Sequence, residues 1–111
     1  MLFRSEHVKG HQYSATGGQL DFVRGAYASR GGKSIIAFHS TAGGGKVSKI
    51  VARLSGPVTT PRTDTHLVVT EYGVANLKGL SSTERANAII RLAAPEFREA
   101  LSVQARELHL L

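Results

Sequence analysis

Two glycines and a glutamine, Gly17-Gly18-Gln19, stand directly before an apolar run with the spacing of a helix. Glycine lets the backbone come close to a ligand because it has no Cβ atom. At the start of a helix, backbone N–H groups point outward without partners, and they can bind a phosphate or the oxyanion of an acyl-transfer reaction. A plain loop-to-helix turn explains the same residues, so both interpretations stay open at this point.

A carboxylate occupies a second position where chemistry is expected. Glu71 follows the short β-type run Val68-Val69-Thr70 and precedes Gly73. Open α/β sheets bind their ligands beyond the carboxyl ends of the strands, so Glu71 is a candidate active-site carboxylate. A glutamate that ends a strand and simply faces water is the alternative, and the residues around it do not exclude that alternative.

Other catalytic and binding motifs are incomplete. The triplet Gly32-Lys33-Ser34 is similar to the end of a P-loop, but Tyr27 stands where the first glycine of that motif belongs. His7 and His11 have the spacing of two metal ligands on a helix, but no third ligand accompanies them. The chain has no cysteine, which excludes thiolate nucleophiles and disulfides. We therefore expect neither a phosphate-binding loop of this type nor a metal site.

Length and composition fit a small globular protein. The 111 residues suffice for one domain, and 41% of them are hydrophobic. The formal net charge of +6 favours anionic partners, but the 14 basic residues are spread from Arg4 to Arg106 without interleaved aromatic rings. No apolar run approaches the roughly 20 residues of a membrane span, and residues 1–6 lack the apolar centre of a signal peptide. We expect a cytoplasmic protein that binds neither nucleic acid nor membrane.

Three segments have the features of helices. Their starts are marked by a capping-box spacing at Thr16 and Gln19, by a second one at Ser81 and Glu84, and by Pro95. The glycine pair Gly31-Gly32 ends the first helix, as glycine after a helix commonly does.

Three short segments predict strands, at 34–40, 47–54 and 67–70. The first is apolar throughout, which predicts burial on both faces, and the second forms a hairpin with the glycine-rich turn before it. The order of elements gives an α/β fold with too few strands for a complete doubly wound sheet. We therefore expect an incomplete part of a larger domain, with the domain at 14–111 and a poorly defined N-terminal segment at 1–13.

Four motifs, taken in order, resemble one family. They are Gly-Gly-Gln-x-Asp-Phe from Gly17, Gly-Lys-x-Ser-x-Ile-Val from Gly45, Val-Thr-Glu-Tyr-Gly-Val-Ala-x-Leu from Val69, and Glu-Arg-Ala from Glu84 followed by Pro-x-Phe-Arg from Pro95. Over about residues 13–106 the sequence resembles the C-terminal part of the acetyl-CoA hydrolase/transferase family, which includes 4-hydroxybutyrate CoA-transferase. The resemblance implies a CoA-transferase-like open sheet, mixed or parallel, flanked by helices.

The resemblance also implies roles for individual residues. Enzymes of this family move coenzyme A between carboxylic acids through a thioester on an enzyme glutamate, or release it to water. By this resemblance Gly18 offers its backbone N–H to the thioester oxygen, and Glu71 is a second active-site carboxylate. Gly17, Gly18, Gln19 and Lys46 contact coenzyme A. The implied substrates are acyl-CoA and small carboxylates, and no metal is required.

Two features depart from the pattern of the family. The nucleophilic glutamate of the family lies upstream of the Gly-Gly pair, and residues 1–13 contain no match to it, since Glu6 is not a credible substitute. Many relatives carry a lysine in the turn where Gly43-Gly44-Gly45 stands here, which leaves Lys46 and Lys49 as the nearby cations. We therefore predict the C-terminal portion of a CoA-transferase or acetyl-CoA hydrolase that contributes to the thioester site but is inactive alone.

Two other functions compete with this prediction. A truncated module that only binds partners or pairs with itself fits the missing nucleophile. The apolar run at 34–40 needs neighbours in any case, either from a homo-oligomer or from a missing N-terminal half. A Gly-Gly-Gln ester hydrolase acting on peptidyl-tRNA suits the positive charge, but those factors carry the triplet in a mobile loop, whereas here it opens a helix.

Overall fold

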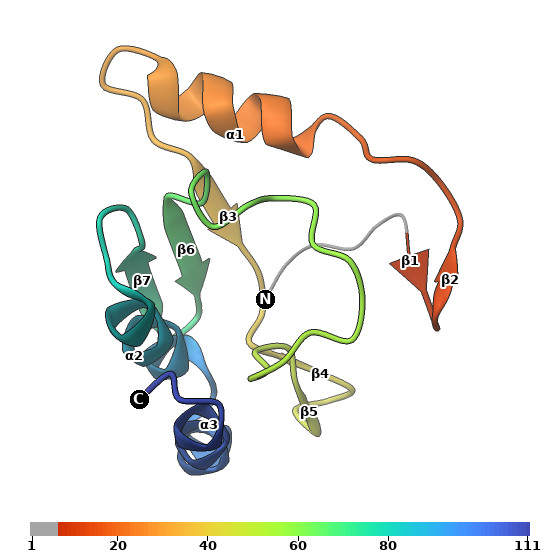
Figure 1. Cartoon of the computed structure of the whole chain (residues 1–111), viewed down its shortest axis with the longest axis vertical. Coiled ribbons are helices and arrows are strands. Elements are labelled where there is room, and N and C mark those ends of the chain that lie inside the picture. Colours follow the sequence, from red (N-terminus) through yellow and green to blue (C-terminus); the bar gives the residue numbers. More distant parts are fainter. Residues whose placement is uncertain (1–6) are drawn as a thin grey trace.

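The computed structural model describes residues 7–111 and has a mixed α/β fold (Figure 1). The strands of this part are β1 (His7–Val8), β2 (His11–Gln12), β3 (Ile35–Ala37), β4 (Thr41–Ala42), β5 (Val47–Ser48), β6 (Leu67–Thr70) and β7 (Gly73–Asn76). The helices are α1 (Gln19–Ala28), α2 (Ser82–Leu92) and α3 (Pro95–Glu107). The predicted α/β class is confirmed, whereas the division of the chain at residue 13 stays a prediction.

The main sheet has three strands in the order β3-β6-β7. The central strand β6 runs parallel to β3, with Val68 opposite Ile36, and antiparallel to β7, with Val68 opposite Ala75. The strand expected at 67–70 is confirmed as β6, but β7 was not predicted. The chain reverses at Glu71 and Tyr72, and Gly73 directly after this turn has a φ of +146°, a backbone conformation that favours glycine.

Helices α2 and α3 pack on one face of this sheet and build the core with it. Val68 and Ala75 of the sheet contact Ala88 and Leu92 of α2 and Leu101 of α3. Each of these side chains is less than one-tenth exposed, so the two helices and the sheet share one buried cluster. Burial of this kind is the main stabilising contribution to a small domain.

Helices α2 and α3 begin where the sequence predicted. Ser81 accepts the N–H of Glu84 on its hydroxyl at 3.2 Å, and the Glu84 carboxylate accepts the N–H of Ser81 at 2.7 Å. Both bonds of a capping box are therefore present, and the prediction for this helix is confirmed. Pro95 lies in the first turn of α3, where its missing N–H costs no hydrogen bond.

Strand β3 is buried on one face rather than on both, so that prediction is wrong. Ile36 is 7% exposed against the core, but Ile35 points to the opposite face and is 58% exposed. Val74 of β7 lies on the same open face and is 64% exposed. Both core-forming helices lie on the other side of the sheet, and no helix of the described part covers these two side chains.

The second predicted strand is much shorter than expected. Only Val47–Ser48 forms a strand, β5, and its hairpin partner is β4 at Thr41–Ala42 rather than the run at 34–40. The Ser48 hydroxyl donates to the carbonyl of Ile50 at 2.7 Å and accepts the N–H of Ile50 at 3.2 Å. Because the side chain takes up these backbone groups locally, the strand ends at Ser48 instead of continuing to residue 54.

Helix α1 is held mainly by contacts at its surface. Val23 is its buried residue, so most of the predicted apolar stripe is not packed in a core. Arg24 donates from Nε to Oδ1 of Asp64 at 2.9 Å, and the ring of Tyr27 meets His66 edge-on with centroids 4.9 Å apart. These contacts place α1 above the start of β3, away from α2 and α3 (Figure 1).

Candidate acyl-CoA site

The glycine pair lies at the start of α1, where the sequence predicted a helix terminus. Gly18 is the N-cap residue, with φ −87° and ψ 7°, and its carbonyl accepts the N–H of Phe22 at 3.1 Å. The capping box predicted from Thr16 is wrong, because the helix begins two residues later and no side chain of the described part caps it. The first N–H groups of α1 consequently have no partner within the helix.

Neither glycine is required by the packing of the described chain. A Cβ atom at Gly17 would meet nothing within 4 Å. At Gly18 it would meet the ring of Phe22 at 3.5 Å, an ordinary van der Waals distance. Both residues also lack the positive φ that demands glycine. A group from outside this part of the chain that comes close to the backbone would explain why glycine stands here.

Glu71 follows β6 directly and is held in place by Ser40. Its Oε2 accepts the backbone N–H of Ser40 at 2.9 Å, and its Oε1 accepts the Ser40 hydroxyl at 2.5 Å. The hydroxyl bond and then the backbone N–H of Ser40 lower the pKa of Glu71 below its ordinary value, with a smaller contribution from His39. Glu71 is therefore an exposed, ionised carboxylate at neutral pH whose position is fixed by its hydrogen bonds to Ser40.

Ser40 was not singled out from the sequence, although it ends the apolar run at 34–40. It is completely buried, and it lies between β3 and the β4–β5 hairpin. A small hydroxyl residue next to an apolar run is common at strand ends. Only the later position of Glu71 at the end of a parallel neighbouring strand could have indicated that the two residues meet.

Lys46 lies in the turn of the β4–β5 hairpin and is exposed. The turn passes through Gly43, Gly44 and Gly45 with φ of +62°, +68° and +91°, so three consecutive residues adopt a left-handed conformation. Figure 1 shows this hairpin beyond the carboxyl end of β3, whereas α1 lies near the start of that strand. The described chain therefore places Lys46 and Glu71 toward the same end of the sheet and does not bring Gly18 to them.

Comparison with known proteins decides the family. The acetyl-CoA hydrolase/transferase C-terminal domain matches residues 3–105, which is nearly the whole chain. The chain belongs to the acetyl-CoA hydrolase/transferase family. The resemblance in the motifs at Gly17, Gly45 and Val69 is thereby confirmed.

Several curated proteins and solved structures are similar to this chain. The 4-hydroxybutyrate coenzyme A transferase of Clostridium kluyveri is 54% identical over 99 residues, which are 87% of this chain and 23% of that protein. The crystal structure of RipA from Yersinia pestis has 67% identity and a TM-score of 0.90, and the match covers 96% of this chain and 24% of RipA. A 4-hydroxybutyrate CoA-transferase from Porphyromonas gingivalis has 48% identity and a TM-score of 0.74, with 82% of this chain and 22% of that chain covered. The chain thus spans about a quarter of the length of these relatives.

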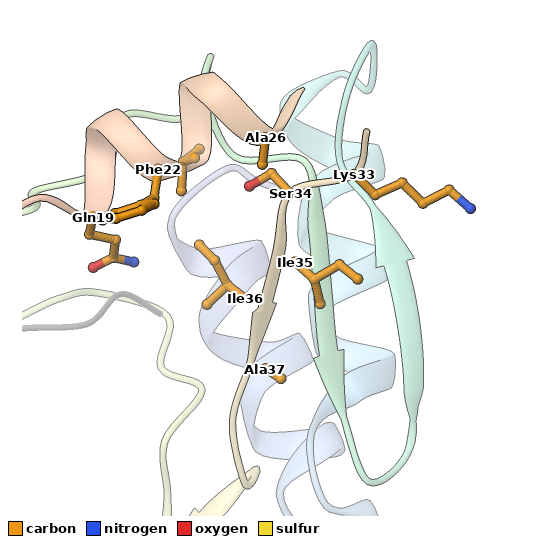
Figure 2. Close-up of a pocket in the computed structure, with 9 residues that line it drawn as sticks. Gln19, Phe22, Ala26, Lys33, Ser34, Ile35, Ile36 and Ala37 are labelled. Carbon is orange, nitrogen blue, oxygen red and sulfur yellow. The ribbon is translucent and has the colours of Figure 1, made fainter. Parts of the chain in front are cut away.

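A cavity borders the start of α1 in this CoA-transferase domain. It has a volume of about 530 Å³ and lies between α1 and β3. Figure 2 shows Gln19 and Phe22 of α1 above this space and the side chains of β3 below it. Gln19 is the first helical residue and is partly buried, so the structure places it at one end of the cavity, next to Gly18.

Metal ligation and membrane insertion find no support in residues 7–111. Within this range no three His, Cys, Asp or Glu side chains gather where they could hold a metal ion. None of the helices in the same range combines the length and the apolar character needed to cross a membrane.

Proposed function

We propose that this domain forms the thioester side of an acyl-CoA:carboxylate CoA-transferase or acetyl-CoA hydrolase site. The N–H of Gly18 binds the thioester oxygen, and Glu71 is a second active-site carboxylate beside the CoA site, toward the other end of the sheet. Gly17, Gln19 and Lys46 contact coenzyme A. The observation that carries this proposal is the pair of glycines at an uncapped helix start, in a position where neither backbone conformation nor packing requires them.

The role of Gly18 follows from the charge that develops during acyl transfer. When a carboxylate attacks the thioester carbon, a C–O bond forms and the π electrons of the carbonyl move onto its oxygen. That oxygen stays negative until the C=O bond re-forms and the C–S bond breaks to release CoA as the thiolate. A backbone N–H at the positive end of a helix dipole stabilises that charge. The absence of a side chain at Gly17 and Gly18 lets the thioester approach this N–H.

The role of Glu71 follows from its fixed, charged state. Its pKa is lowered by Ser40, so at neutral pH it accepts hydrogen bonds and is not a proton donor. A carboxylate of this kind can orient the polar groups of a substrate or hold a water molecule. The nucleophilic glutamate of the family has no match in residues 1–13, so we place the nucleophile in the part of the longer relatives that this chain does not span.

Activity of the isolated chain is the first test. We expect no exchange of label between acetyl-CoA and acetate above a control without protein, because the covalent intermediate needs a nucleophile that this chain does not supply. Clear exchange by the isolated chain would contradict our placement of the nucleophile.

A chimera tests the proposed site itself. In this chimera the chain replaces the matching 23% of the Clostridium kluyveri 4-hydroxybutyrate coenzyme A transferase. We expect transfer of CoA from acetyl-CoA to 4-hydroxybutyrate. Glu71→Gln keeps one oxygen to accept from Ser40 but removes the charge, so we expect a slower reaction in a folded protein. An unchanged rate would show that Glu71 only holds Ser40 in position by hydrogen bonds and takes no part in the reaction.

A binding module without catalysis is the second candidate. It is favoured by large apolar side chains on the surface of the described part, among them Phe22 at 80% and Ile35 at 58% exposure. Exposed apolar surface of this kind marks an interaction site or an incomplete core. A folded chimera that binds acyl-CoA but transfers nothing would favour this second function.

A further inference from the structure

Strand β3 is an edge strand in the described part of the chain, although its pairing is of a kind that is normally enclosed. It pairs with β6 on one side only. Sheets built of parallel strands normally have both faces covered. An exposed edge of this kind also offers unpaired backbone groups to any other strand.

The hydrogen bonds show which backbone groups of β3 are free. Ser34 accepts the N–H of Leu67 at 3.0 Å, and Phe38 donates its N–H to Val69 at 3.0 Å. Backbone groups alternate in direction along a strand, so residues 34, 36 and 38 face β6. The N–H and C=O groups of Ile35 and Ala37 therefore point away from β6, toward the free edge.

Helix α1 lies over this edge and leaves a space beneath it. The cavity of about 530 Å³ is bounded by Phe22, Val23 and Ala26 of α1 and by Ile35 and Ile36 of β3. In Figure 2 the first turns of α1 stand over the side of β3 that faces away from β6. The helix thus covers a position next to β3 that no strand of the described part occupies.

We propose that the free edge of β3 pairs with a parallel strand from the part of the longer CoA-transferase polypeptide that this chain does not span. Neighbouring strands lie about 4.8 Å apart, so an added strand would run directly beneath α1. It would cover Phe22, which is 80% exposed, and bond to the outward backbone groups of Ile35 and Ala37. The inference rests on family membership and chain length, and not on the proposed roles of Gly18 and Glu71.

Two observations favour this partner over a second copy of the same chain. The relatives are about four times as long as the matched region, so most of their polypeptide lies outside the match and could supply a strand at this position. A two-fold axis perpendicular to the sheet would pair β3 with its copy and would bring both α1 helices onto one face. Helices are about 10 Å wide, and two of them do not fit over two strands that lie about 4.8 Å apart.

Amide hydrogen exchange tests the pairing without measuring activity. In the isolated chain we expect fast exchange at Ile35 and Ala37, and slower exchange at Ile36, which faces β6. In the chimera we expect exchange at Ile35 and Ala37 to slow at least about tenfold, the factor that corresponds to about 1.4 kcal/mol. Equally fast exchange in both proteins would refute the proposal. Protection in the isolated chain that rises with its concentration would show self-pairing and would refute it as well.

A pair of proline variants makes the test independent of the exchange data. Ala37→Pro removes an outward N–H on the β3 edge. Val74→Pro removes an outward N–H on the opposite edge. The N–H of Leu77 donates to the carbonyl of His66 at 2.8 Å, and inward and outward backbone groups alternate along β7, so the N–H of Val74 points away from β6. Proline is tolerated on an edge strand when its position does not donate to the ladder.

The two variants have different expected results in the two proteins. Ala37→Pro should lower the melting temperature of the chimera clearly more than that of the isolated chain, because only the chimera supplies a strand that needs this N–H. Val74→Pro should lower both melting temperatures by similar amounts. If Ala37→Pro has the same effect in both proteins, β3 remains an edge and the proposal is wrong. A chimera in which the edge of β3 is protected but no CoA is transferred would contradict the proposed roles of Gly18 and Glu71 and leave the strand pairing intact.

Discussion

Replacement of Gly18 separates a role in binding the oxyanion from a role as a plain turn. Gly18→Pro removes the N–H that we assign to the thioester oxygen. The φ of −87° lies near the range that proline adopts, and this N–H precedes the hydrogen-bonded ladder of α1. Gly18→Ala keeps the N–H and adds a Cβ atom, which meets only the ring of Phe22 at 3.5 Å. Neither change should unfold the domain.

The expected magnitudes follow from these contacts. Loss of one oxyanion donor typically lowers kcat about 100- to 1000-fold, or about 2.7–4 kcal/mol, so Gly18→Pro should slow the chimera by this order. Gly18→Ala should slow it less, because the donor stays while the approach of the thioester is hindered. Alanine at an N-cap costs the helix about 0.5–1 kcal/mol, which lowers the melting temperature by a few degrees at most.

The assay is transfer of CoA from acetyl-CoA to 4-hydroxybutyrate by the chimera, with thermal unfolding measured on the same samples. Gly25→Ala is the matched control, since Gly25 lies in the middle of α1 and a Cβ atom there meets nothing within 4 Å. It should raise the stability of the helix and leave the rate unchanged. If Gly18→Pro is as active as Gly25→Ala, Gly18 donates no catalytic hydrogen bond and the glycine pair is only a turn.

The contact between Ser40 and Glu71 predicts a pH dependence. The folded pKa of Glu71 lies below its ordinary value of 4.5, so the contact stabilises the fold above that pH and this contribution is lost as the pH falls through the folded pKa. The stability difference between the parent and Ser40→Ala, followed by circular dichroism, should therefore narrow on acidification; a difference that is constant down to pH 2 would contradict this account. Ser81→Ala should cost about 1 kcal/mol by loss of the N-cap, seen as a lower melting temperature, while Ser81→Asp should keep most of the stability.

The sequence predicted elements whose signals are local. The capping box at Ser81, the proline at the start of α3 and the apolar run of β6 each specify a structure within a few residues, and the structure contains all three. Strand β7 was missed because Gly73-Val74-Ala75-Asn76 is short and contains only one β-branched residue. Its pairing with β6 depends on the turn at Glu71 and Tyr72 and on packing against α2, which the segment itself does not reveal.

Errors arose where the result depended on distant partners. The capping box at Thr16 has the right spacing, but the chain enters α1 at Gly18 and the side chain is not used. Burial of Ile35 was inferred from an apolar run, and it requires neighbours that residues 7–111 do not provide. In the candidate site, Gly18 and Glu71 were predicted from their places at the ends of elements, whereas the bond between Ser40 and Glu71 joins residues 31 positions apart.

The surface attachment of α1 has a consequence for the order in which the molecule opens. Residues from α2, α3, β6 and β7 form the buried cluster, and none of its members comes from α1. An ion pair with an exposed arginine contributes little to stability. Segments held in this way unfold locally while the rest of a domain remains intact. We therefore expect α1, with Gly18 at its start, to unfold before α2 and α3, so a ligand or a neighbouring strand that contacts α1 should stabilise the end of the chain carrying the proposed oxyanion donor.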